Sequence, residues 1–181
     1  MTSTTWYVVL VLAVGVERLV ELRVSAVNLR WSRERGGIER GSRHFRVMTV
    51  LHVGLLAGCL LEVSLLDRPF LPWLGAPMLV LALAAQALRW WVIATLGHQW
   101  NVRVVVVPGL PRVTGGPFRW ARHPNYVAVV TEGIALPLVH TAWLTAAAFT
   151  LVNAGVLAVR IRCENTALDE VLVGTSARRT A

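Results

Sequence analysis

The feature that most constrains this chain is that its apolar residues occur in long uninterrupted blocks. Three blocks begin near Thr5, His44 and Met78, and two more begin near Tyr126 and Trp143. Apolar residues make up 55% of the 181 residues and charged residues only 15%, which is less charge than a soluble domain of this size carries. The pattern predicts an all-α integral membrane protein with about five transmembrane helices.

Glycines and prolines set the expected ends of the first helices. The first helix continues past its apolar run, through Trp31, so we expect it to project beyond the bilayer. Gly36, Gly37 and Gly41 are expected to end it. The second apolar block then covers about residues 44–66.

Two non-helical stretches are predicted between the later blocks. Prolines are expected to keep residues 67–77 (DRPFLPWLGAP) out of a helix, so the third helix should cover about residues 78–96. Residues 97–122 are more polar. Within them, Val104–Val107 are expected to form a short extended segment that ends at Pro108.

The last two blocks, about residues 126–139 and 143–159, are predicted to form a short helical hairpin, because only Pro137 to Thr141 separate them. A helix of about 14 residues spans roughly 21 Å, which is less than the roughly 30 Å of the hydrocarbon core. The fourth helix is therefore expected to lie tilted and deep in the protein, or to cross only part of the bilayer.

Arginine accounts for all 18 basic residues, and its distribution predicts the orientation of the chain. Seven arginines lie in or beside the first loop, one in the second, four in the third, none in the fourth and four after the last block. This alternation predicts a multi-pass protein of the cell membrane with its N-terminus outside and its third loop and C-terminus in the cytosol. Topology and membrane lipids then explain the net charge of +8, and no nucleic-acid partner is expected.

The segment GGPFRWARHPNY, residues 115–126, combines several features of a ligand site. Its glycines allow close approach of a backbone, and Pro124 suits the first turn of a helix. His123 and Asn125 would then lie beside the free amides of that helix end, where anionic groups are favoured. The segment suits the carboxylate of a small ligand. The alternative is a proline-rich interfacial turn whose arginines only set the topology.

Three charged residues in the last third of the chain are further candidates. Arg160 and Glu164 are four residues apart and share one face of the last helix, either as a functional pair or as a simple salt bridge. Glu132 lies midway along the fourth helix, and an ionisable group at membrane depth is a functional candidate by default. Its alternative role is to pack against an arginine or a tryptophan.

The five histidines show no HExxH motif or other metal-ligand spacing, so no metal site is expected. A haem held by His52 and His98 is the basis of a competing hypothesis, a non-enzymatic haem-binding or assembly protein. Glu17, Arg18 and Glu21 are expected to satisfy one another in an interfacial network. Without a glycine-rich nucleotide motif, a Rossmann-type methyltransferase domain is not supported.

The stretch GPFRWARHPNY, followed by a short hairpin and then RIRCEN, resembles the isoprenylcysteine carboxyl methyltransferase family, membrane enzymes that use S-adenosylmethionine. The similarity covers about residues 96–168. The family signature, RHPxY and a later RxxxE, is present here at residues 122–126 and 160–164. The N-terminal half is similar to a bacterial branch whose members often accompany type III polyketide synthases and methylate alkylpyrones or alkylresorcinols.

The resemblance implies a role for each residue of these motifs. The residues expected to bind the cofactor, and its product S-adenosylhomocysteine, are Leu110, Pro111, Arg112, Val113, Phe118, His123, Pro124, Asn125, Tyr126 and Glu164. Arg160 would face the methyl acceptor and, with Glu164, form the catalytic pair. Phe118 replaces a tyrosine that is common in the family, and Asn165 replaces a second glutamate of many relatives.

The resemblance also predicts a single membrane methyltransferase domain over residues 1–181. Its expected parts are N-terminal helices 1–96, a cofactor-binding loop and catalytic hairpin 97–170, and a mobile tail 171–181. The favoured acceptor is a lipophilic polyketide hydroxyl in the membrane, and the alternative is an isoprenylcysteine-like carboxylate. A carboxylate held by Arg160 needs no base, whereas a hydroxyl would need one, for which Glu164 or His123 are candidates.

Overall fold

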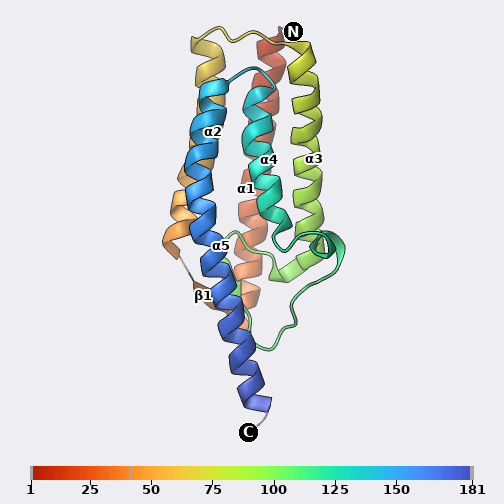
Figure 1. The fold of residues 1–181 in the computed structure, drawn as a ribbon, viewed down its shortest axis with the longest axis vertical. Coiled ribbons are helices and arrows are strands. Elements are labelled where there is room, and N and C mark those ends of the chain that lie inside the picture. The colour runs from red at the N-terminus through yellow and green to blue at the C-terminus, as the bar shows by residue number, and fades with distance from the viewer. Residues whose placement is uncertain (1, 41, 180–181) are drawn as a thin grey trace.

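Five helices, four of 24 to 37 residues and one of 15, run side by side in the computed structural model, which describes residues 2–40 and 42–179 (Figure 1). The helices are α1 (Ser3–Glu34), α2 (Ser42–Leu65), α3 (Pro72–Leu96), α4 (Pro124–Leu138) and α5 (Trp143–Arg179). The short elements are η1 (Gly97–Gln99), η2 (Gly116–Arg119), β1 (Ile38–Arg40) and β2 (Val104–Val106).

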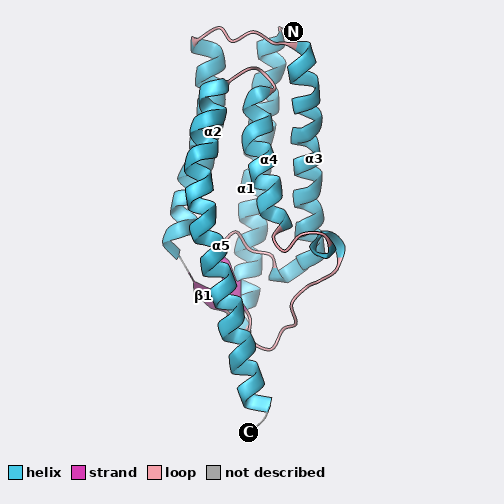
Figure 2. Ribbon diagram, viewed as in Figure 1, coloured by secondary structure: helices cyan, strands magenta, loops and turns pink. Residues whose placement is uncertain are grey.

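The chain begins at one end of the bundle, called here the N-terminal end, and α5 finishes at the other, called here the C-terminal end (Figure 2). The long connection between α3 and α4 also lies at the C-terminal end. The structure therefore agrees with the prediction that the third loop and the end of the chain share one side of the bundle.

Three of the five helices are long and apolar enough to cross a membrane. The segments concerned are Phe45–Leu65, Pro72–Gln99 and Trp143–Ala167. Apolar side chains point outward along the bundle, and Val50, Leu65 and Leu151 are each more than 70% exposed, as expected where lipid surrounds a protein. α4, at about 22 Å, is shorter than the hydrocarbon core, as predicted.

Three features differ from the prediction. α3 begins at Pro72, inside the stretch predicted to be non-helical, because a proline in the first turn of a helix loses no hydrogen bond. α5 continues to Arg179, through the predicted tail, because no proline interrupts it. The predicted extended segment is confirmed as β2, but it pairs antiparallel with a strand that was not predicted, β1, with Ile38 opposite Val106, so the chain is not entirely α-helical.

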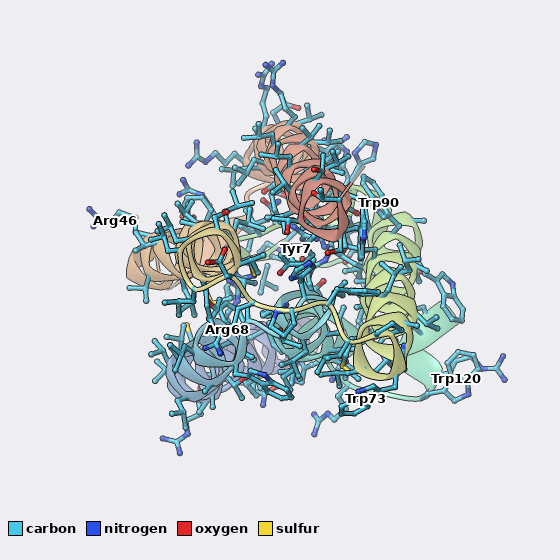
Figure 3. All side chains as sticks on the ribbon, turned by 90° about the horizontal axis from the view of Figure 1, so that it is seen from above. Tyr7, Arg46, Arg68, Trp73, Trp90 and Trp120 are labelled. Atoms are coloured by element: carbon cyan, nitrogen blue, oxygen red, sulfur yellow. The ribbon has the colours of Figure 1, made fainter. Side chains whose placement is uncertain are left out.

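One face of α1 faces the interior along the whole helix. Its positions repeat at spacings of four and three, which keeps them on one side of a helix. They are Tyr7, Val11, Val14, Arg18, Glu21, Ser25, Asn28 and Ser32. Tyr7, Val11 and Val14 are called here the apolar half of this face, and the other five the polar half. In Figure 3, which looks along the bundle, Tyr7 points among the helices while Trp73 and Trp120 lie at the periphery.

The N-terminal end is closed by a few specific polar contacts within an apolar core. The Tyr7 hydroxyl donates a hydrogen bond to the carbonyl of Leu136 on α4 at 3.0 Å. The Glu62 carboxylate accepts from the backbone N–H groups of Leu144 and Thr145, at 3.1 and 2.7 Å. Because these amides have no partner within α5, Glu62 caps that helix from α2.

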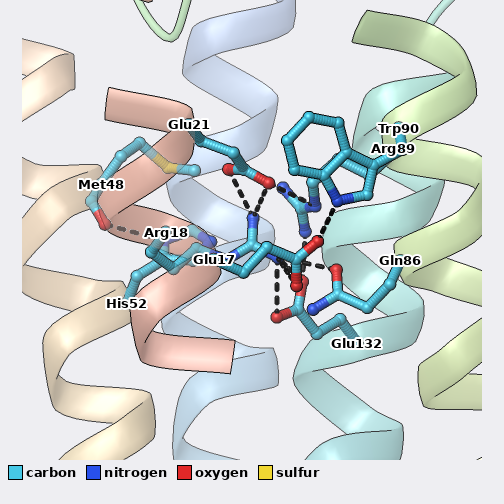
Figure 4. A network of polar contacts seen from close by, with 9 residues as sticks. All are labelled: Glu17, Arg18, Glu21, Met48, His52, Gln86, Arg89, Trp90 and Glu132. Carbon is cyan, nitrogen blue, oxygen red and sulfur yellow. Dashed lines mark hydrogen bonds and ion pairs between the residues drawn. The ribbon is translucent and has the colours of Figure 1, made fainter. Parts of the chain in front are cut away.

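The charges of α1 form a larger network than predicted, and it joins three helices (Figure 4). Arg18 pairs with Glu21 at 2.6 Å and with Glu132 of α4 at 3.3 Å. Arg89 of α3 pairs with Glu132 and lies 3.5 Å from Glu21. These four residues make a closed ring of alternating charge, and Glu17 adds a contact to the Trp90 indole N–H at the edge.

Candidate active site

A cavity of about 180 Å³ lies at the C-terminal end of the bundle, between the end of α3, the start of α4 and the middle of α5. Residues from both predicted motifs and from the predicted cofactor segment line it. The eleven predicted site residues that line it are Leu110, Pro111, Arg112, Val113, Phe118, His123, Pro124, Asn125, Tyr126, Arg160 and Glu164. Segments 50 residues apart in the sequence therefore meet at one place.

The start of α4 presents the RHPxY motif to the cavity. The helix begins at Pro124, and His123 is the residue that precedes it, with φ of −135° and ψ of 64°. The prediction that Pro124 occupies the first turn of the fourth helix is thereby confirmed. The N-terminus of this helix lies beside the cavity, where the helix dipole favours a negatively charged group.

Tyr126 links the two residues of the RxxxE motif. Its hydroxyl donates a hydrogen bond to the Glu164 carboxylate and accepts one from Nε of Arg160 at 3.1 Å. The Arg160 guanidinium also lies over the Tyr126 ring, 5.7 Å from its centre. Among the ion pairs of the described residues, Arg160 and Glu164 are not joined directly. The alternative of a simple salt bridge is therefore replaced by an arginine–tyrosine–glutamate chain.

His123 completes the contacts between α4 and α5. Its Nδ1 lies 3.4 Å from Oε1 of Glu164, and its Nε2 lies 3.2 Å from Oδ1 of Asn165. The imidazole also stacks on Tyr126, with ring centres 5.4 Å apart. Asn165, at the position where many relatives carry a glutamate, is thus a partner of the motif histidine.

The segment from η1 to β2 forms a wall of the cavity to which the sequence assigned no role. Gln99, Trp100 and Asn101 line the cavity, and the Val102 carbonyl accepts a hydrogen bond from Nη2 of Arg160 at 2.5 Å. Polar residues between two apolar blocks were the only sequence signal for this wall. They marked a loop without indicating which residues face a ligand.

The cavity carries an excess of positive charge. Of the side chains that the structure describes, four arginines line it, at 103, 112, 122 and 160, against the one carboxylate of Glu164. Arg103 is neutralised by Glu39 of β1 at 2.6 Å, and Glu39 also pairs with Arg33. Partial burial alone would raise the pKa of Glu39, but hydrogen bonds and charge from Arg103 and Arg33 outweigh it and lower the pKa.

The remaining candidates have structural partners. Glu132 pairs with Arg18 and Arg89, which matches its predicted alternative role as a packing partner of an arginine. His52 bonds to the Met48 carbonyl at 2.8 Å, and His98 stacks on Trp31 with ring centres 5.3 Å apart. Within the described part of the chain, no group of three or more His, Cys, Asp or Glu residues is arranged to hold a metal ion.

The chain is similar to a known protein family and to two bacterial proteins. Residues 78–170, just over half of the chain, match the model of the isoprenylcysteine carboxyl methyltransferase (ICMT) family. An uncharacterized Bacillus subtilis protein, YpbQ, is 35% identical over 169 residues, 93% of this chain and 98% of that protein. An uncharacterized Haemophilus influenzae protein is 27% identical over 140 residues, 76% of this chain and 80% of its own length.

No solved structure matches the chain. The family match contains both signature motifs, and the same motifs line one cavity of a helical bundle with apolar, membrane-length segments. The chain therefore belongs to the isoprenylcysteine carboxyl methyltransferase family.

Proposed function

We propose that this protein is an S-adenosylmethionine-dependent O-methyltransferase whose acceptor is a lipophilic molecule in the membrane. The favoured acceptor group is the hydroxyl of an alkylpyrone- or alkylresorcinol-type polyketide. The observation that carries the proposal is the meeting of RHPxY, RxxxE and the segment 110–113 around one cavity. Separate structural roles for the motifs would not require them to line a common space.

The residues of the cavity fit the mixed chemistry of the cofactor, which has a carboxylate, two cationic groups, ribose hydroxyls and a flat purine. Glu164 offers a carboxylate to a cationic group, while Arg112 and Arg122 offer positive charge to a carboxylate. Oδ1 of Asn125 is buried without a hydrogen-bond partner among the described residues, which favours a donor on a bound molecule. Phe118 supplies a flat apolar surface.

The bound cofactor would supply an already activated methyl group, so the protein mainly needs to position the acceptor oxygen and exclude water. Transfer breaks the carbon–sulfur bond as the new carbon–oxygen bond forms. Arg160, held in place by Tyr126 and Val102, would orient the acceptor. The proton of a hydroxyl acceptor would pass to Glu164, or to His123 beside it.

The proposed arrangement in the membrane places the C-terminal end of the bundle in the cytosol and the N-terminus outside the cell. The cavity then faces the compartment that contains the cofactor. It is also lined by residues of two membrane-length segments, Pro72–Gln99 and Trp143–Ala167, so an acceptor dissolved in the bilayer can reach it.

The test is transfer of a tritiated methyl group from S-adenosylmethionine by the detergent-purified protein to an alkylresorcinol, an alkylpyrone and N-acetyl-S-farnesylcysteine. A methyl ether survives alkali, whereas a methyl ester releases volatile methanol. We expect alkali-stable label on a polyketide. Alkali-labile label on the prenylcysteine would show that the acceptor is a carboxylate and not a polyketide hydroxyl. If folded protein labels none of the three acceptors, the methyltransferase proposal is contradicted.

Arg160→Ala sharpens the same test. We expect its kcat/KM for the acceptor to fall about 100-fold, since loss of an orienting contact misplaces the reacting oxygen. The KM for the cofactor should stay within about twofold in the same assay. Arg162→Ala is the matched control, because Arg162 is exposed two residues further along the same helix. Equal activity of both variants would contradict the role of Arg160.

A further inference from the structure

Arg160 is connected to α1 through one intermediate residue. Its Nη2 donates to the Val102 carbonyl at 2.5 Å, and the Val102 backbone N–H donates to the hydroxyl of Ser25 at 3.2 Å. Ser25 is only 3% exposed, and its hydroxyl also lies 2.8 Å from the Asn101 side-chain amide. One buried hydroxyl of α1 therefore fixes the residue that receives the arginine.

A second residue of α1 fixes the turn that precedes Val102. Nδ2 of Asn28 donates to the carbonyls of Trp100 and Gly97, at 2.8 and 3.2 Å, and Oδ1 lies 3.3 Å from Nδ1 of His98. Asn28 is 5% exposed and Trp100 is 3% exposed, so the bond to the Trp100 carbonyl is buried. Together, Ser25 and Asn28 hold the segment from residue 97 to residue 102 against α1.

The same face of α1 holds the opposite wall of the cavity. Arg18 and Glu21 join α1 to Glu132 and Arg89 in the closed ring of charges (Figure 4). Glu132 lies eight residues along α4 from Pro124, which is about 12 Å or roughly two turns. The ring therefore fixes where α4 lies along the length of α1 and, with it, the position of the RHPxY motif.

We propose that α1 is the positioning element of the cavity and that Ser25 is the positioning residue for Arg160. The polar half of its buried face sets the distance between the wall that carries RHPxY and the wall that anchors Arg160. α1 lies outside the segment 78–170 that matches the family. The consequence for methyl transfer rests on the proposed function, whereas the positioning itself does not.

The test compares wild-type protein with Ser25→Ala, Ser25→Thr, Asn28→Leu and Val27→Ala in detergent. Hydrogen exchange of residues 97–103 is measured by mass spectrometry, and binding of S-adenosylhomocysteine by calorimetry. Loss of one buried hydrogen bond should speed exchange of this segment about fivefold in Ser25→Ala. Ser25→Thr retains the hydroxyl and should restore slow exchange. Val27→Ala changes an exposed residue of the same helix and should match the wild type.

The functional readout is a split between the two substrates. In Ser25→Ala the KM for an acceptor that the wild type methylates should rise about fivefold, while the affinity for S-adenosylhomocysteine stays within about twofold. Unchanged exchange of residues 97–103 in both Ser25→Ala and Asn28→Leu would overturn the positioning role. Faster exchange spread over all helices would overturn it as well. A wild type that binds no S-adenosylhomocysteine would contradict the proposed function, and exchange would still decide the role of α1.

Discussion

The two halves of the buried face of α1 use different interactions within one continuous helix. In the apolar half, Tyr7, Val11 and Val14 pack into a cluster of side chains from α2, α4 and α5. In the polar half, Arg18 and Glu21 make charged contacts, and Ser25 and Asn28 bond to the backbone of the cavity wall. The change of chemistry coincides with the change from bundle core to candidate active site.

The physical setting explains why the difference matters. Inside a bilayer, lipid tails are as apolar as the side chains, so close packing and polar contacts hold helices together in place of the hydrophobic effect. Packing alone tolerates small shifts of one helix along another, whereas a charged ring and directed hydrogen bonds fix a register. A methyltransferase site needs that fixed register, because its catalysis depends on the position of the acceptor.

The largest effect is expected for Arg89→Leu, which removes one cation from the ring of charges in the polar half. Glu21 and Glu132 are 4% and 3% exposed, and their carboxylates would be left with Arg18 alone. We expect the free energy of unfolding to fall by about 3–5 kcal/mol. The measurement is unfolding by SDS in mixed micelles.

The control for this prediction is the double variant Arg89→Leu/Glu132→Leu, which removes one charge of each sign. It should be more stable than Arg89→Leu, because Arg18 and Glu21 remain as a balanced pair. Additive losses in the double variant would show that the ring contributes by packing and not by charge.

Leu136→Ala probes the apolar half. Leu136 is fully buried beside Tyr7, so shortening its side chain leaves a cavity and should cost about 2–4 kcal/mol in the same unfolding measurement. The affinity for S-adenosylhomocysteine should stay within about twofold, because the residue lies at the far end of α4 from the cavity. Weaker binding by more than about tenfold would mean that the two halves are not separable.

The smallest expected effect concerns pH at the edge of the polar half. The pKa of Glu39 is below its ordinary value of 4.5, so its ion pairs stabilise the fold fully above that value. The stabilisation is lost as the pH falls through the lowered pKa. Arg33 is 63% exposed, so we expect less than about 1 kcal/mol. The measurement is the protection of the Val104–Val106 amides, that is, their exchange rate relative to the intrinsic rate at each pH. Glu39→Gln should abolish the fall of this protection at low pH, and an unchanged fall would contradict the prediction.

Much of the fold was readable from the sequence because the determining patterns are local. Apolar blocks and breakers located the five helices, and Pro124 located the start of α4. The prolines at 72 and 77 misled the prediction for α3, because Pro72 starts the helix, where proline is tolerated, and the helix continues through Pro77. The three-residue strand β1 carried too little pattern to be recognised.

The sequence predicted which motif residues line the candidate site, but it did not predict which of them contact one another. Resemblance supplied the motif residues, and the structure brings them around one cavity. The bridging role of Tyr126 and the support from Ser25 and Asn28 depend on which side chains meet in three dimensions. One signal was present, because polar residues at spacings of three and four from Arg18 to Ser32 mark a buried polar face.

The most direct test of the account is calorimetry of S-adenosylhomocysteine with detergent-purified wild type, His123→Ala and Val127→Ala. His123 lines the cavity and stacks on Tyr126, whereas Val127 is exposed in the first turn of α4. We predict micromolar binding by the wild type and by Val127→Ala, and a loss of about tenfold or more in His123→Ala. No binding by folded wild type, or equal binding by all three proteins, would contradict the assignment of this cavity as the cofactor site.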